Sequence, residues 1–138
     1  MRYLGLDLGS KTLGIAISDK TNTIASVYKT IRYDNENYDL LIREIAKIVE
    51  ENDITNIVLG YPLNMNNTIG QRAEITLSFK KMIEDKINVK VTLMDERLTS
   101  VISNNVLIEA DISRKKRKKK VDGIAAVVIL QSFLDKER

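Results

Sequence analysis

The first 18 residues alternate between two kinds of side chain, and this pattern constrains the fold more than any other part of the chain. Alternation with a period of two is typical of β-strands that bury one face. Residues 9–12, Gly-Ser-Lys-Thr, separate two such runs as a turn, so the pattern predicts a β-hairpin of residues 2–8 and 13–18. Its buried face is predicted to carry Leu4, Leu6, Leu8, Leu13, Ile15 and Ile17.

The other face of this hairpin carries small side chains around one acid. Asp7 shares that face with Gly5 on the first strand and with Gly14 and Ala16 on the second. Glycine inside a strand often marks a place where a ligand or another backbone approaches closely. We therefore expect room beside Asp7 for a metal ion, a phosphate group or a packed helix. The alternative is that Asp7 only caps the following turn.

Downstream of the hairpin, strand patterns alternate with helical ones. We expect an antiparallel meander of three strands, then parallel strands joined by helical crossovers, within one α/β domain. A chain of 138 residues is long enough for one such core. Asp34 or Asn35 is available as the N-cap of the first helix. The further elements expected are strands at 23–31, 54–59 and 89–93, and helices at 35–52, 70–84, 98–108 and 121–134.

Two residue types that serve much of enzyme chemistry are missing. The chain has no Cys and no His, which excludes disulfides, zinc sites of the usual Cys/His kind, Cys nucleophiles and His general bases. Any catalysis must therefore use carboxylates, Lys, Ser or Thr, Tyr or a metal ion. No apolar run has the length of a membrane span, and the N-terminus lacks the pattern of a secretory signal, so we expect a cytoplasmic location.

Two further acids lie at the ends of apolar segments. Glu96 follows the strand expected at 89–93, with Asp95 beside it as the alternative, and Asp122 begins an almost wholly apolar helix. Each acid alone could simply cap a helix or interact with the helix dipole. Together with Asp7 they favour a divalent-metal site, because oxygen ligands suit Mg²⁺ or Mn²⁺. Two such ions can activate water and stabilise the departing oxygen of a phosphodiester without histidine.

A run of seven consecutive cations lies between the second and third of these acids. It carries +7 while the whole chain carries +3, so the remainder of the chain is at −4. Such a run is either solvated surface or a sequence-independent contact with phosphates, and we predict the second, in a mobile loop because like charges repel. An acidic metal site beside a basic tract indicates an enzyme that cuts nucleic acid. The basic tract comprises Arg114, Lys115, Lys116, Arg117, Lys118, Lys119 and Lys120.

Four ordered motifs resemble one family of bacterial proteins. With them, the whole chain resembles the YqgF-type family, whose members are similar to Holliday-junction resolvases and are described as pre-16S rRNA nucleases. Two departures from the family pattern are Tyr61, where Leu is common, and Lys11 with Thr12, where Arg is common. The motifs are Gly5-Leu6-Asp7-Leu8-Gly9 with Gly14-Ile15-Ala16, Gly60-Tyr61-Pro62-Leu63-Asn64-Met65 with Gly70 and Ala73-Glu74, Asp95-Glu96-Arg97-Leu98-Thr99-Ser100, and Asp122 with Ala125-Ala126 and Ile129-Leu130-Gln131-Ser132.

The resemblance implies a ribonuclease H-like fold, a five-stranded mixed sheet flanked by helices, in a single nuclease domain over residues 1–138. It implies that Asp7, Glu96 and Asp122 are catalytic carboxylates that bind Mg²⁺ or Mn²⁺, with two ions expected. Lys11 and Arg97 are predicted to contact nucleic acid together with the basic tract. The implied role is processing of the 5′ end of the 16S rRNA precursor by a monomer or homodimer, with cleavage of branched DNA junctions as the older assignment.

Two other classes of function remain open from the sequence. The hairpin around Asp7 also resembles the phosphate-binding hairpin of actin-like sugar kinases and chaperone ATPases. Those proteins need two such domains to enclose ATP, and 138 residues provide only one. The other class is a non-catalytic RNA-binding or assembly factor that keeps the fold. ATP binding without cleavage would favour the first class, and a metal-dependent cleavage assay distinguishes the second from a nuclease.

Overall fold

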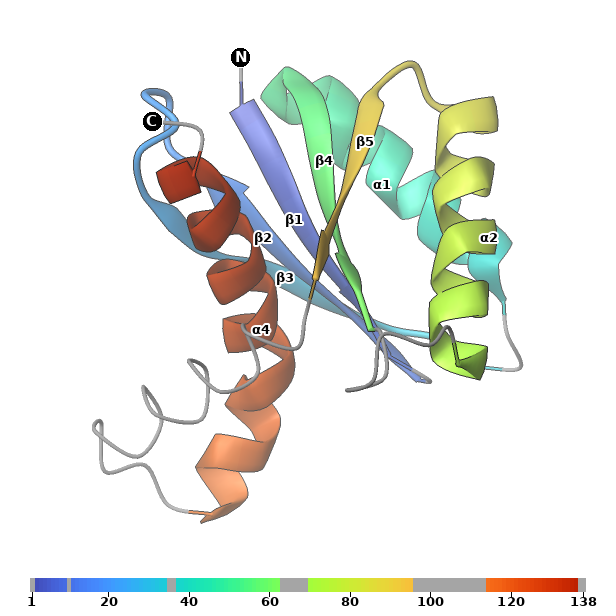
Figure 1. Cartoon of the computed structure of the whole chain (residues 1–138), viewed down its shortest axis with the longest axis vertical. Helices are drawn as coiled ribbons and strands as arrows, with labels where there is room; N and C mark the ends of the chain where they lie inside the picture. The colour runs from blue at the N-terminus through green and yellow to red at the C-terminus, as the bar shows by residue number, and fades with distance from the viewer. Residues whose placement is uncertain (1, 10, 35–36, 63–69, 96–113, 137–138) are drawn as a thin grey trace.

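Five strands form one mixed β-sheet in the computed structural model, which describes residues 2–9, 11–34, 37–62, 70–95 and 114–136, the first ten of the last range by their backbone only. The sheet order is β3-β2-β1-β4-β5. β2 pairs antiparallel with β1 and β3, whereas β4 pairs parallel with β1 and β5 (Figure 1). The predicted meander followed by parallel strands is therefore confirmed. The strands are β1 (Arg2–Leu8), β2 (Thr12–Ser18), β3 (Ala25–Arg32), β4 (Ile54–Tyr61) and β5 (Lys90–Asp95).

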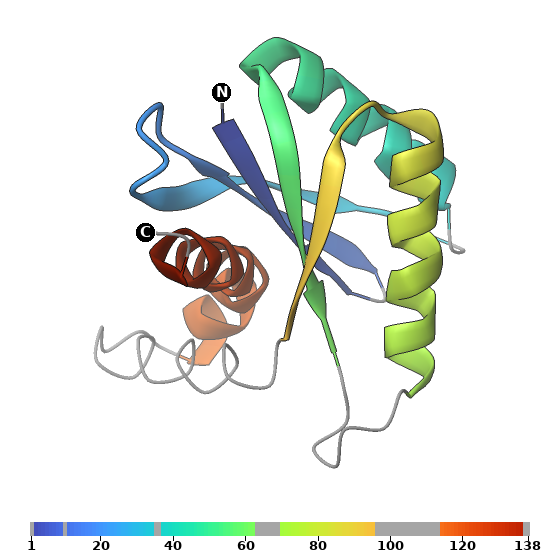
Figure 2. The ribbon, with the colours of Figure 1, turned by 45° about the horizontal axis from the view of Figure 1, so that its top comes forward.

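Helices cover both faces of the sheet. α1 (Tyr38–Asn52) and α2 (Gln71–Lys86) lie on one face, and α4 (Arg114–Lys136) crosses the other, as the two views in Figures 1 and 2 show. α1 joins β3 to β4 and α2 joins β4 to β5, so each returns the chain to a parallel strand. None of the helices in the described residues is long and apolar enough to cross a membrane.

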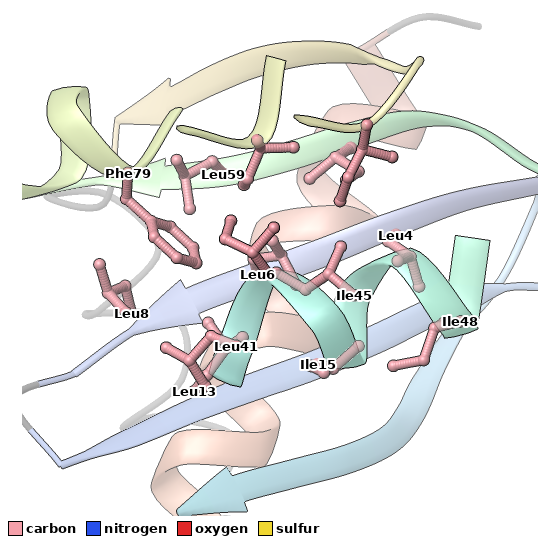
Figure 3. Close-up of a cluster of buried hydrophobic side chains, with 14 of the residues drawn as sticks. Leu4, Leu6, Leu8, Leu13, Ile15, Leu41, Ile45, Ile48, Leu59 and Phe79 are labelled. Carbon is pink, nitrogen blue, oxygen red and sulfur yellow. The ribbon is translucent and has the colours of Figure 1, made fainter. Parts of the chain in front are cut away.

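The aliphatic side of the initial hairpin forms the larger hydrophobic core. Leu6 and Ile15 are fully buried there and meet Leu41 and Ile45 of α1 and Phe79 of α2 (Figure 3). The buried face predicted from the alternation is thus confirmed. The elements predicted from sequence differ from these strands and from α2 by at most two residues at either end.

α1 begins later than expected, at Tyr38. Asn37 is its N-cap, with a side-chain oxygen that accepts a hydrogen bond from the backbone N–H of Leu40 at 3.3 Å. The prediction of Asp34 or Asn35 as the N-cap is therefore wrong. The physical reason is reach, because a side chain can cap only the amides two or three positions after it.

The basic tract is helical, and the prediction of a mobile loop is wrong. α4 starts at Arg114 and contains the whole tract ahead of its apolar half. Lys and Arg are strong helix formers, and a helix already anchored by its apolar half extends without a second nucleation step. The buried residues from Ala126 onward provide that anchor on the sheet. The helix expected at 98–108 lies outside the described residues.

α4 packs directly against the sheet at Gly5. A Cβ atom placed on Gly5 would lie 2.7 Å from the Cβ of Leu130 and 2.8 Å from the carbonyl oxygen of Ala126. Further toward the start of β1, the rings of Tyr3 and Phe133 lie 5.7 Å apart, centroid to centroid. The helix therefore runs antiparallel to β1 along this contact. Of the three roles expected for the small residues around Asp7, close packing of a helix is the one that Gly5 serves.

Candidate active site

Asp7 lies near the C-terminal end of β1, the central strand of the sheet. Its partner on β2 is Gly14, and the second pair back along the strands joins Gly5 to Ala16. Because side chains alternate along a strand, the half-buried Asp7 shares the face of Gly5, which is the face that α4 covers. The predicted small surroundings of this carboxylate are therefore present. Asp7 and these small residues lie at the end of the sheet where the three parallel strands β1, β4 and β5 terminate.

The alternation along β5 separates Asp95 from Asp7. Leu93 packs into the core beneath α1 and α2, whereas Met94 packs into the core beneath α4. Asp95 therefore lies on the face of Leu93, opposite the face that carries Asp7. Glu96, the ligand preferred from the sequence, lies outside the described residues.

Asp122 lies inside α4 and not at its start. The helix begins about two turns earlier, at Arg114, so Asp122 cannot be the N-cap. Residues four apart share one face of a helix, which puts Asp122 one turn before Ala126 on the side of α4 that contacts Gly5. The explanation of Asp122 as a simple helix cap, which the sequence left open, is therefore excluded. Its side chain is not among those described.

Asp7 and Asp122 both lie toward the C-terminal end of β1 from the point where α4 contacts Gly5. The step from Gly5 to Asp7 leads along β1 toward its C-terminal end. Since α4 runs antiparallel to β1, the step from Ala126 back to Asp122 leads in the same direction. Two residues of strand and four residues of helix each span about 6–7 Å. The packing of α4 on β1 therefore places the backbones of both acids toward the same end of the sheet, where the parallel strands end.

The described side chains include no group of three acidic residues able to hold a metal ion. Those side chains include Asp7 and Asp95 but neither Glu96 nor Asp122. The fit to a metal therefore rests on donor chemistry and on the position of Asp7. Three carboxylates without nitrogen or sulfur ligands are the donors that Mg²⁺ and Mn²⁺ prefer, and Gly14, the partner of Asp7 on β2, contributes no side chain there.

Two side chains hold the turn that directly follows Asp7. The Nη2 atom of Arg72, in the first turn of α2, donates a hydrogen bond to the carbonyl oxygen of Leu8 at 2.9 Å. The hydroxyl of Tyr33 donates to the carbonyl oxygen of Gly9. Neither residue was predicted from the sequence. No local pattern marks them, because each acts on a segment that is distant in the chain.

Burial raises the pKa of the Tyr33 hydroxyl. The side chain is only 3% exposed, the charge of Tyr38 raises the pKa further, and Arg72 opposes the shift. A raised pKa keeps the hydroxyl protonated at neutral pH. Tyr33 therefore remains a hydrogen-bond donor to Gly9.

Tyr33→Phe is expected to reduce the loss of stability in alkali. A tyrosine whose pKa is higher in the folded than in the unfolded state makes the free energy of unfolding fall as pH rises above about 10. Phe has no proton to lose, so the variant should lose stability less steeply there. Urea denaturation at a series of pH values measures this slope, with Tyr28→Phe as the control on β3. Equal slopes for Tyr33→Phe and the parent would contradict the expectation.

The predicted nucleic-acid contacts fall into three groups. Lys11 is exposed in the turn between β1 and β2, at the same end of the sheet as Asp7. The basic tract is described by its backbone as the first part of α4. Arg97 lies outside the described residues.

Comparison with known proteins gives consistent matches. A family model described as "RuvX: Holliday junction resolvase" matches residues 1–136. A protein named "Putative pre-16S rRNA nuclease" from Geobacillus sp. (strain WCH70) is 46% identical over 138 residues, which cover 100% of both chains. A protein of the same name from Clostridium beijerinckii is 50% identical over 135 residues, covering 98% of this chain and 96% of that one.

A solved structure shares the fold. T. thermophilus RuvC, in complex with a Holliday junction substrate, matches with a TM-score of 0.66 at 10% identity, covering 99% of this chain and 96% of that chain. Together with the five-stranded mixed sheet, this likeness confirms the predicted ribonuclease H-like fold.

Proposed function

This chain belongs to the RuvX family of Holliday junction resolvases, and we propose that it is a nuclease that hydrolyses phosphodiester bonds in structured nucleic acid. The names of its relatives make the 5′ end of the 16S rRNA precursor the first candidate substrate and branched DNA the second. The observation that carries the proposal is the position of Asp7. It lies at the end of the central strand, opposite a glycine, on the face that α4 covers. An RNA precursor as substrate implies action in the bacterial cytoplasm.

The proposed catalytic carboxylates are Asp7, Glu96 and Asp122, as ligands of Mg²⁺ or Mn²⁺. When bound, two such ions supply an activated water and stabilise the departing oxygen. Glu96 is preferred to Asp95 because one more step of the alternation along β5 leads from the face of Asp95 back to that of Asp7. Asp122 is supported by its place one helical turn before the contact of Ala126 with Gly5.

Cations near this end of the sheet are proposed to bind the phosphates of the substrate. Lys11 is exposed in the turn that follows Asp7. The N-terminal part of α4, which contains the basic tract, projects past the sheet in Figure 1. A helix with seven consecutive cations in its sequence favours contact with a phosphate backbone over readout of bases.

Replacing all seven cations of the basic tract by Gln is expected to weaken binding of structured RNA at low salt. Gln keeps the helix propensity but removes the charge, so fewer counterions are released on binding. The slope of log K against log salt should become shallower by roughly 0.7–0.9 for each phosphate that the variant no longer neutralises. Filter binding at several salt concentrations measures this slope. Lys47→Gln and Lys81→Gln, on the helices of the other face, form the control, and an unchanged slope for the tract variant would contradict the prediction.

A cleavage assay tests the proposed activity directly. The purified chain is incubated with a 5′ fragment of 16S rRNA precursor or with a four-way DNA junction, in Mg²⁺, in Mn²⁺ or with a chelator. We expect metal-dependent cleavage that the chelator abolishes. Cleavage of the junction alone would make branched DNA the substrate class. If neither substrate is cleaved in either metal, the proposed nuclease activity is contradicted and the non-catalytic RNA-binding alternative is favoured.

A further inference from the structure

We propose that Arg72 and Tyr33 are positioning residues that fix the carboxylate of Asp7 for metal binding, an inference that rests on the proposed function of Asp7. Their side chains hold two consecutive carbonyl groups, those of Leu8 and Gly9, directly after Asp7. Arg72 comes from α2 and Tyr33 from the segment after β3, so the turn is held from two separate parts of the fold.

The Leu8 carbonyl lies where β1 and β4 cease to pair. Their register in the described residues ends with the pair Leu6 and Leu59. The next N–H, that of Gly9, is turned toward β2 and donates there at 2.8 Å. Because the N–H and C=O of one peptide point in opposite directions, the Leu8 carbonyl is turned toward β4, beyond the last pair of the ladder. Arg72 supplies the donor for that carbonyl, and thereby extends the restraint on β1 past Asp7.

Tyr33 holds the other side of the same turn through two bonds. Its hydroxyl donates to the Gly9 carbonyl, and its backbone N–H donates to the Lys11 carbonyl at 3.0 Å. Its ring is buried and packs against Tyr38 with the centroids 5.7 Å apart, which fixes the position of the hydroxyl. The guanidinium of Arg72 lies near enough to the Tyr33 hydroxyl to oppose the rise in its pKa, and the two side chains hold adjacent carbonyl groups. The two residues therefore act as one clamp on Leu8, Gly9 and Lys11.

A clamp of this kind matters more for a metal ligand than for an ordinary surface acid. A carboxylate binds a metal well only when its backbone keeps the oxygen atoms within about 0.5 Å of the required position. Loss of groups that orient metal ligands typically costs about 10- to 100-fold in metal affinity or activity. A purely structural clamp would lower the stability of the fold and leave metal affinity unchanged. Metal affinity therefore separates the two roles.

The test uses Tyr33→Phe, which removes one hydroxyl, and Arg72→Gln, which removes the guanidinium. Electron paramagnetic resonance titration gives the dissociation constant for Mn²⁺, and cleavage kinetics give kcat and KM. We expect Mn²⁺ affinity to fall about 10-fold or more in each variant, and kcat at limiting Mn²⁺ to fall in parallel. Saturating Mn²⁺ should restore most of kcat. Tyr28→Phe and Arg43→Gln, both on exposed side chains, are the matched controls and should bind Mn²⁺ like the parent.

The outcomes separate this inference from the proposed function. If Asp7→Asn loses Mn²⁺ while the Arg72 and Tyr33 variants bind it like the parent, the positioning role is wrong and the proposed function stands. Reduced thermal stability with unchanged Mn²⁺ affinity would overturn the role in the same way. If the parent binds no Mn²⁺, the proposed function and this inference both fail. Amide exchange at Gly9, expected to be faster in both variants, would then still show whether they hold the turn.

Discussion

Asp7→Asn is expected to reduce the rate of metal-dependent cleavage by orders of magnitude and leave the fold intact. Asn has the shape of Asp but no negative charge, so it is a poor ligand for Mg²⁺ or Mn²⁺. Bound metal contributes several kcal/mol to stabilising the transition state, and each 1.4 kcal/mol is tenfold in rate, so we expect a loss of about a thousandfold. The fold should survive because Asp7 is half-buried at the end of β1, outside both hydrophobic cores.

The same loss is expected for Glu96→Gln and for Asp122→Asn. Asp95→Asn is the matched control, because Asp95 is adjacent in sequence to Glu96 and lies on the opposite face of the sheet from Asp7. Single-turnover cleavage with Mg²⁺ measures the rate, and circular dichroism with thermal unfolding checks the fold. Full activity in all three variants would show that the site is misassigned. Loss in Asp95→Asn with full activity in Glu96→Gln would make Asp95 the ligand.

Gly5→Ala is expected to destabilise the protein and to reduce cleavage at the same time. The added Cβ would lie 2.7 Å from the Cβ of Leu130 and 2.8 Å from the carbonyl oxygen of Ala126, so α4 must move away from the sheet. Overpacking of this kind costs about 1–3 kcal/mol in the free energy of unfolding. The lower backbone entropy of Ala in the unfolded chain offsets about 0.5–1 kcal/mol of that cost. Displacement of α4 would also displace Asp122 relative to Asp7.

Gly9→Ala provides the comparison for Gly5→Ala. Its added Cβ would lie 3.1 Å from the carbonyl oxygen of Thr12, a milder approach in a turn and not beneath a helix. Urea denaturation of both variants should therefore show the larger loss of stability for Gly5→Ala. Equal or greater stability of Gly5→Ala relative to the parent would mean that α4 does not need glycine at this contact.

The buried face of the first hairpin and the antiparallel meander followed by parallel strands were predictable from sequence. A period of two reports burial of one face directly, so the positions of Leu6 and Ile15 in that pattern were enough to indicate the larger core. The conformation of the basic tract was not predictable in the same way. Charge repulsion between neighbouring residues favours a loop. The helix is instead stabilised by the apolar residues that follow the tract, which pack on strands far away in the sequence.

The candidate site was only partly predictable. Asp7, Glu96 and Asp122 could be proposed from the pattern of acids and from family resemblance. Local sequence favoured Glu96 but kept Asp95 as the alternative, and the packing of Leu93 and Met94 on opposite faces of the sheet adds a structural reason to separate them. The assignment of the three carboxylates as metal ligands stays a prediction.

Sequence alone determined the period of each strand, the absence of Cys and His chemistry, and the motifs that indicated the family, because each of these is a property of short segments. The tertiary structure alone showed that Asp122 lies inside α4 and that this helix packs directly against Gly5. It also showed that Arg72 and Tyr33 hold the turn after Asp7. Arg72 and Leu8 are 64 positions apart in the chain. A hydrogen bond over such a separation depends on the path of the whole chain, which no local pattern of residues encodes.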